Sequence, residues 1–108
     1  MAQEKSFENK IKRYLKDSGA YRVKYFGCSY SESGTSDILA CVNGYFLAIE
    51  VKAQTGKPSE LQLVKINDIR KAGGFAYVAY PGGWERLKDI IDGLLIDKFN
   101  REEDVILK

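Results

Sequence analysis

The dipeptide Asn43-Gly44 lies between two apolar segments, 38–42 and 45–51, and constrains the fold more than any other feature of the sequence. Asn-Gly is the strongest short hairpin signal, because a type I′ turn needs a positive φ angle at both central residues. The two segments are therefore predicted to be adjacent antiparallel strands. In that register residue 42 faces residue 45, and Asp37 directly faces Glu50 on one side of the sheet.

Helical patterns precede and follow this hairpin. Ser6 is predicted to cap a first helix, with apolar residues at 7, 11, 14 and 15 and a stop at Gly19. Ser59 and Gln62 have the form of a capping box that opens a second helix through about residue 72. A third helix is expected from about residue 84 to 99, because its apolar residues follow one stripe.

Strand patterns complete the predicted architecture. Segment 21–28 alternates apolar and charged residues, and segment 75–80 is a short run dense in aromatics. The resulting order is αβββαβα. A strand that follows a crossover helix predicts an α/β fold with a mixed sheet flanked by helices. The 108 residues, 44% of them hydrophobic, fit a single domain over residues 1–108.

The residue types exclude several kinds of chemistry. The chain contains no histidine, which excludes imidazole bases and Ser-His or Cys-His nucleophile pairs. Its two cysteines are too few for a disulfide scaffold or a four-ligand zinc site. Catalysis by this chain would therefore depend on carboxylates, lysines and a metal ion held by oxygen atoms.

Charge and hydropathy patterns bear on location and partners. The N-terminus lacks a basic stretch followed by an apolar run, and nowhere do about 18 apolar residues follow one another. We therefore expect a soluble, cytoplasmic protein with no membrane partner. Residues 1–24 carry seven Lys and Arg against three Asp and Glu. This basic end is either a surface for a polyanion or a solvated helix face.

The predicted hairpin gathers two acids and a lysine at one end of an apolar surface. Lys52 lies two residues beyond Glu50 and so points to the face that Asp37 and Glu50 share. Two facing acids favour the binding of a hard cation, which prefers oxygen ligands. Glu50 also lies inside the apolar run 46–51, where a surface acid is not expected. The alternative is a structural salt bridge in which Lys52 neutralises the acids. The residues alone leave both interpretations open.

Three segments together resemble the PD-(D/E)XK nuclease superfamily, and within it the VRR-NUC group of small stand-alone nucleases, often encoded by phages. They are Gly34-Thr35-Ser36-Asp37, Ile49-Glu50-Val51-Lys52 and Gly56-Lys57-Pro58-Ser59-Glu60-Leu61-Gln62. The resemblance spans about residues 7–80 and departs from the usual pattern at Ser36, where the family has proline. It implies a restriction-endonuclease-like αβββαβ core, here with an added C-terminal helix. It also implies a protein that works in the cytoplasm of a bacterial or phage-infected host cell.

The resemblance also implies roles for individual residues. Asp37, Glu50 and the main-chain carbonyl of Val51 would hold Mg²⁺ or Mn²⁺, while Lys52 would orient or activate the attacking water. Glu8 corresponds to an acidic position that supports the metal ligands or binds a second metal; its alternative is an ion pair with Lys12. Gln62 corresponds to a polar residue near the lysine, although its capping box explains it equally well.

Further residues are expected to contact nucleic acid. They are Lys10, Arg13, Tyr30, Ser33 and Lys57. Tyr30 would stack on a base or sugar, Ser33 would shape the loop leading to the metal, and Lys57 would touch a backbone phosphate. The alternative for Tyr30 is a loop tyrosine without a binding role, and the alternative for Lys57 is a surface lysine in a turn.

The expected function is that of a Mg²⁺- or Mn²⁺-dependent endonuclease that hydrolyses phosphodiester bonds in branched DNA, above all a Holliday junction. A homodimer is expected, because symmetric resolution needs two cuts on opposed strands. Ile96 and the tail 105–107 add apolar surface that either joins two copies or folds back onto the core. The alternative functions are a non-catalytic nucleic-acid-binding module with the same fold, or a structural role without nucleic acid.

Overall fold

The computed structural model describes residues 2–23, 38–101 and 104–108. It contains a five-stranded sheet in the order β1-β2-β3-β4-β5. The elements are α1 (Ala2–Asp17), β1 (Tyr21–Val23), β2 (Ile38–Val42), β3 (Tyr45–Val51), α2 (Glu60–Lys71), β4 (Phe75–Ala79), the 3₁₀ turn η1 (Pro81–Gly83), α3 (Trp84–Leu95) and β5 (Ile106–Leu107).

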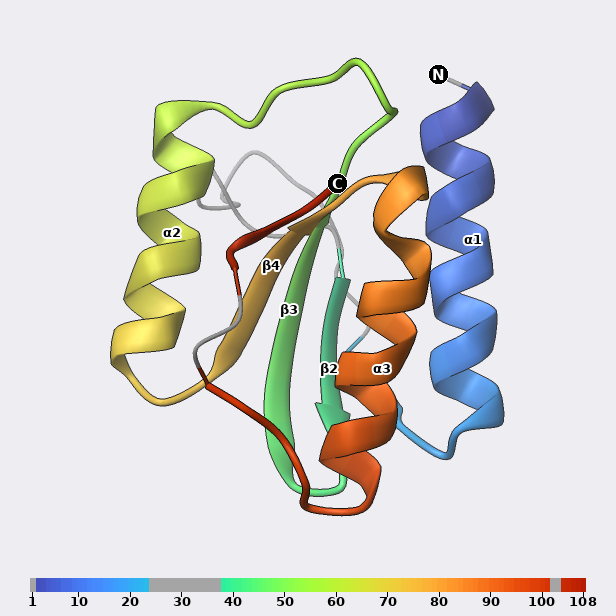
Figure 1. Cartoon of the computed structure of the whole chain (residues 1–108), viewed down its shortest axis with the longest axis vertical. Helices are drawn as coiled ribbons and strands as arrows, with labels where there is room; N and C mark the ends of the chain where they lie inside the picture. The colour runs from blue at the N-terminus through green and yellow to red at the C-terminus, as the bar shows by residue number, and fades with distance from the viewer. Residues whose placement is uncertain (1, 24–37, 102–103) are drawn as a thin grey trace.

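The sheet is mixed, and helices cover both of its faces. Strands β1, β2 and β3 pair antiparallel, whereas β3, β4 and β5 pair parallel. Helices α1 and α3 pack on one face and α2 on the other (Figure 1). This confirms the predicted α/β fold and is consistent with a restriction-endonuclease-like core. No helix among the described residues is long and apolar enough to cross a membrane.

The central hairpin has the predicted turn and register. Asn43 and Gly44 have φ angles of 51° and 86°, as a type I′ turn requires. The pairing runs from Ile38 opposite Ile49 to Val42 opposite Tyr45. Asp37, the partner predicted for Glu50, lies outside the described residues.

Strand β3 is buried on both sides, which explains its apolar sequence. Leu47, Ile49 and Val51 belong to the core beneath α1 and α3, whereas Ala48 packs with Ile66 of α2. Side chains alternate between the faces, so Glu50 points to the α2 side. Glu50 is 3% exposed and is the one buried charged residue among those the structure describes.

The first helix begins earlier than its sequence pattern predicted. Helix α1 starts at Ala2, so Ser6 lies inside the helix and the predicted cap is wrong. The segment before Ser6 consists of good helix formers, which extend the helix without an apolar stripe. The side chain of Gln3 also accepts a hydrogen bond of 2.8 Å from the backbone N–H of Gln54, a tertiary contact that local pattern cannot show.

The third helix ends earlier than predicted, at Leu95 rather than Phe99. Asp97 adopts a positive φ of 58°, and the N–H of Lys98 donates to the carbonyl of Gly93 at 2.8 Å. This is the hydrogen-bond pattern of a Schellman C-cap, with an aspartate where glycine is usual. Because Asp tolerates the left-handed region, the helix stops without the glycine signal on which the prediction relied.

The C-terminal tail forms a strand that the sequence analysis did not predict. Strand β5 pairs with β4, with Ile106 opposite Val78 and Leu107 opposite Ala79. Leu107 is fully buried. The tail therefore folds back onto the core, which decides between the two expectations stated for residues 105–107.

Candidate active site

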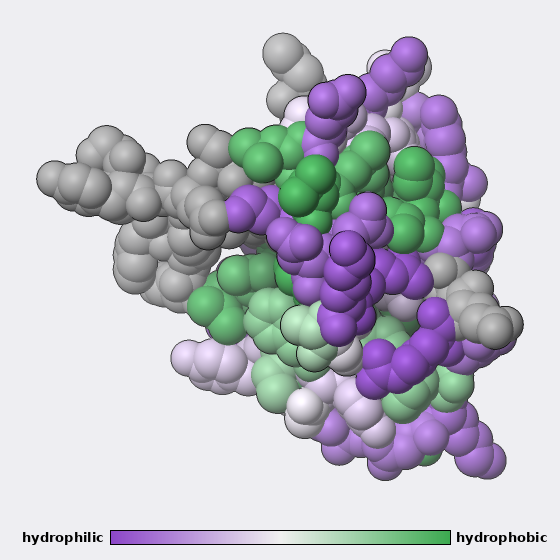
Figure 2. Space-filling view, turned by 90° about the vertical axis from the view of Figure 1, so that its left-hand side faces the viewer, coloured by the Kyte–Doolittle hydropathy of each residue, from purple (hydrophilic) through white to green (hydrophobic). Residues whose placement is uncertain are grey.

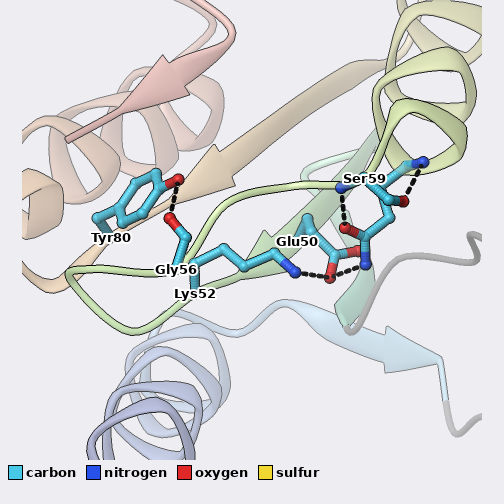
Figure 3. A network of polar contacts seen from close by, with 6 residues as sticks. Glu50, Lys52, Gly56, Ser59 and Tyr80 are labelled. Atoms are coloured by element: carbon cyan, nitrogen blue, oxygen red, sulfur yellow. Dashed lines mark hydrogen bonds and ion pairs between the residues drawn. The ribbon is translucent and has the colours of Figure 1, made fainter.

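Glu50 and Lys52 meet at the end of β3. Lys52 Nζ lies 3.7 Å from Glu50 Oε2, and both side chains are largely shielded from solvent (Figure 3). The backbone N–H of Lys52 donates to the carbonyl of Ala79 at 3.0 Å, which continues the β3–β4 ladder one residue beyond the strand. The sheet thus fixes the backbone from which the side chains of Glu50 and Lys52 project.

Gln62 links this pair to helix α2. Its Nε2 donates to Glu50 Oε2 at 2.9 Å, while its Oε1 accepts from the backbone N–H of Ser59 at 2.8 Å. Its own backbone N–H donates to Ser59 Oγ at 3.1 Å, so the predicted capping box is confirmed. The side chain of Gln62 therefore caps the helix and also donates to the buried acid. The capping-box explanation of Gln62 is therefore confirmed, its described side-chain contact at the site is with the acid Glu50, and its catalytic role stays a prediction.

The cluster holds a carboxylate in an otherwise apolar setting. Removing a carboxylate from water is costly unless a cation and hydrogen bonds offset the loss. Lys52 and Gln62 supply both to the same oxygen of Glu50. The arrangement places a buried acid beside a cation, which is found in metal-assisted hydrolytic sites and also in structural ion pairs.

Several predicted site residues cannot be compared with this geometry. Asp37, Tyr30 and Ser33 lie outside the described residues. Within residues 2–23, 38–101 and 104–108, no group of three His, Cys, Asp or Glu side chains could hold a metal ion. The acid pair predicted for the metal therefore remains a prediction, of which Glu50 is the described half.

Glu8 makes the ion pair that was its structural alternative. Its Oε2 lies 2.5 Å from Lys12 Nζ and 3.8 Å from Lys5 Nζ, both on α1. These are i,i+4 and i,i+3 partners on one helix face. The role of Glu8 toward a metal stays a prediction.

The predicted DNA-contacting lysines and arginine lie on two separate parts of the surface. Lys10 and Arg13 line a cavity of about 260 Å³ on α1 together with Ser6 and Asn9. Lys10 Nζ is also 5.1 Å from the ring centroid of Trp84 on α3. Lys57 is exposed in the loop between β3 and α2, near the Glu50 cluster in sequence.

A larger basic cavity lies between α1 and β1. Its volume is about 450 Å³, and four of its lining residues are cationic: Lys12, Arg13, Lys16 and Arg22. All four belong to the basic segment 1–24, which was expected to be either a surface for a polyanion or a solvated helix face. The sequence pattern did not predict that the turn after α1 would bring them around one concavity.

Tyr80 is a residue of the site region that sequence reasoning missed. The sequence pattern predicted only that Tyr80 belongs to a strand rich in aromatic residues. In the structure its hydroxyl also donates to the carbonyl of Gly56 at 2.8 Å. No local pattern signals this contact, because the two residues are brought together only by the parallel pairing of β3 and β4.

Comparison with known proteins adds an independent finding. Residues 2–104 match the family model described as archaeal Holliday junction resolvase (hjc). That family belongs to the PD-(D/E)XK superfamily, so the superfamily assignment is confirmed. No curated protein and no solved structure matches the chain. Because the matched segment covers almost the whole sequence, the chain belongs to the archaeal Holliday junction resolvase (hjc) family.

Proposed function

We propose that the protein is a Mg²⁺- or Mn²⁺-dependent endonuclease that cuts four-way DNA junctions by direct attack of water, without a covalent intermediate. Its family implies Holliday junction resolvase nuclease activity. The observation that carries the finer proposal is the cluster of Lys52, Glu50 and Gln62 at the end of β3. The VRR-NUC grouping and a phage origin are finer assignments that stay predictions.

The donor atoms suit the proposed metal. The Glu50 carboxylate and the main-chain carbonyl of Val51 are hard oxygen donors on consecutive residues of β3. Mg²⁺ prefers such ligands and is usually bound through one or two carboxylates, with waters and substrate phosphates completing the octahedron. Asp37 would be the second carboxylate in this proposal. A bound Mg²⁺ would polarise a phosphoryl oxygen and lower the pKa of water.

The residues of the chain would do the remaining work. Lys52 would orient the attacking water and offset charge on the scissile phosphate, since it is a cation held beside the acid without histidine nearby. Gln62 would hold the Glu50 carboxylate in place through its hydrogen bond. Lys10, Arg13, Lys57 and Tyr30 would contact DNA, and Ser33 would shape the loop that leads to the metal.

A homodimer remains part of the proposal, on narrower grounds. The tail no longer supports it, because β5 folds onto the core. Junction resolution needs two cuts on opposed strands, which still supports a homodimer, and closed two-fold dimers are the commonest oligomers. Ile96 is 63% exposed, and Leu61 and Val64 of α2 are exposed as well. The face of the molecule on the α2 side shows hydrophobic patches among hydrophilic residues (Figure 2). Light scattering at micromolar concentration tests this, and a monomer would remove the paired-cut argument.

The test of function compares a labelled four-way junction with a linear duplex of the same sequence. Cleavage of the junction should need Mg²⁺ or Mn²⁺, stop with chelator and exceed duplex cleavage at matched salt. Asp37→Ala, Glu50→Gln and Lys52→Ala should each lower the rate by at least about a hundredfold. Lys71→Ala, an exposed lysine at the end of α2, is the matched control and should cut normally.

Two outcomes would contradict the proposal. Wild-type activity in Asp37→Ala would remove the acid pair from the mechanism. Salt-dependent binding to the junction without cleavage under any divalent ion would favour the non-catalytic binding module instead.

A further inference from the structure

Tyr80 contacts the loop that follows the functional lysine. This loop, residues 52–59, connects β3 to α2 and is called here the Lys52 loop. Tyr80 is 3% exposed, and its ring packs in the smaller core cluster beneath α2. Its hydroxyl donates to the carbonyl of Gly56 at 2.8 Å (Figure 3). Burial raises the pKa of Tyr80, so the hydroxyl keeps the proton that this hydrogen bond needs at neutral pH.

Gly56 in turn faces the stem of Lys52. A Cβ atom built on Gly56 would lie 3.6 Å from both Cβ and Cδ of Lys52, so the space between this backbone and the lysine stem is no wider than a methyl group. The N–H of Gly56 donates to the carbonyl of Ala53 at 2.8 Å, which closes a tight turn over that side chain. The backbone at Gly56 thus forms one wall of the space that the lysine occupies.

The other side of Lys52 is set by the Glu50 cluster. The lysine has four rotatable side-chain bonds and loses rotamer entropy when it is fixed, so it needs confinement to keep one geometry. Its ammonium is 3.7 Å from Glu50 Oε2, and its stem faces Gly56 across the width of a methyl group. A shift of Gly56 away from the sheet would open this space.

We propose that Tyr80 is a positioning residue for the nuclease reaction: by holding Gly56, it confines Lys52 beside Glu50. The inference rests on the proposed function of Lys52. In this proposal Tyr80 acts through its hydrogen bond to the backbone of Gly56, which faces Lys52, and not by direct contact with substrate or metal.

Other contacts make Tyr80 a fixed support for the loop. Its backbone N–H donates to the carbonyl of Leu107 at 2.9 Å, and Lys108 Nζ lies 5.0 Å from its ring centroid. Strand β5 therefore fixes the backbone of Tyr80, and the hydroxyl of Tyr80 anchors the Lys52 loop. Gln54 gives the loop a second anchor, since its Oε1 accepts from the N–H of Gly82 at 2.7 Å.

The test removes the hydroxyl and keeps the ring. Tyr80→Phe should slow single-turnover cleavage of a labelled four-way junction about three- to tenfold, the effect of one hydrogen bond. The dissociation constant for the junction, measured in chelator, should stay within about twofold. Tyr45→Phe is the matched control. Its hydroxyl also makes a hydrogen bond, to Asp97, but it lies at the opposite end of β3, about 17 Å from Glu50.

A second measurement does not depend on catalysis. Amide hydrogen exchange in the Lys52 loop should quicken in Tyr80→Phe and stay unchanged in Tyr45→Phe, because only the first loses the loop's anchor. In a Lys52→Arg background, Tyr80→Phe should cost less than it does in the wild type, because both changes act on the same cation.

The outcomes separate this inference from the proposed function. Full cleavage activity in Tyr80→Phe, or losses that simply add in the double variant, would overturn the role of Tyr80 while leaving the nuclease intact. Loss of junction affinity in Tyr80→Phe equal to its loss of rate would also overturn it. A wild-type protein that cuts no junction with any divalent ion would instead refute the proposed function.

Discussion

Tyr14 illustrates how a single side chain couples two helices. Its hydroxyl donates to Asp92 Oδ1 of α3 at 2.5 Å, and its ring meets Trp84 edge-on with centroids 5.4 Å apart. The hydrogen bond to Asp92, followed by desolvation and by the negative charges of α3, raises the pKa of Tyr14 to about 12. The folded state therefore favours the protonated phenol.

This pKa shift predicts a pH-dependent contribution to stability. The contribution is fully present below the ordinary tyrosine pKa of about 10 and is lost as the pH rises through about 12. Tyr14→Phe should destabilise the protein by up to about 1 kcal/mol at pH 8, discounted for partial solvent exposure. Urea unfolding of both proteins at pH 8 and 11.5 tests this. The gap should shrink at the higher pH, and a constant gap would contradict the assignment.

At the level of elements, the β2–β3 turn also caps helix α3. Asn43 Nδ2 donates to the carbonyls of Leu94 and Leu95 at 3.1 and 3.3 Å. Asp97, at the C-terminus of the helix, accepts a hydrogen bond from the hydroxyl of Tyr45 at 2.5 Å. The turn thus satisfies helix carbonyls that otherwise lack partners within the helix.

Two substitutions of Asn43 separate these roles. Asn43→Gly keeps a type I′ turn but loses the donor, and should cost about 0.5–1.5 kcal/mol of unfolding free energy. Asn43→Asp should be worse by about 1 kcal/mol at pH 7, because it places a carboxylate beside helix carbonyls and Asp97. Urea unfolding at pH 7 and pH 3.5 measures both. If the aspartate variant shows no relative recovery at the lower pH, the charge explanation is wrong.

At the scale of the whole molecule, β5 closes the fold. It adds a parallel strand beside β4 and brings the carbonyl of Leu107 against Gly83. A Cβ atom on Gly83 would lie 2.1 Å from that carbonyl oxygen, far inside any normal contact. In the sequence, the close approach of Leu107 to Gly83 is indicated only by the glycine itself, and a glycine at this position is equally typical of a turn.

The prediction at this scale compares neighbouring residues of β5. Leu107→Ala should lower the unfolding free energy by about 2–5 kcal/mol, because Leu107 is fully buried. Ile106→Ala, at a side chain that is 40% exposed, should cost less than about 1.5 kcal/mol. Urea unfolding at neutral pH checks the pair. Equal losses would mean that the tail does not pack as a strand in solution.

Local sequence determined those features whose causes are local. The Asn43-Gly44 turn, the register of the hairpin and the Ser59–Gln62 capping box follow from φ preferences and side-chain reach over a few residues, and the structure confirms each. The E-x-K segment likewise indicated that Glu50 and Lys52 share a face, because side chains alternate along a strand. The pairing of Asp37 with Glu50 stays a prediction.

Tertiary structure decided the contacts made across long sequence separations. The start of α1 depends in part on Gln3 meeting Gln54, and the end of α3 on Asp97 at positive φ beside Asn43 and Tyr45. Strand β5 is two residues long, too short to carry a pattern of its own, and forms because β4 offers it an edge. The support of Lys52 by Tyr80 exists only because parallel pairing places Ala79 next to Val51, which no local property of either residue encodes.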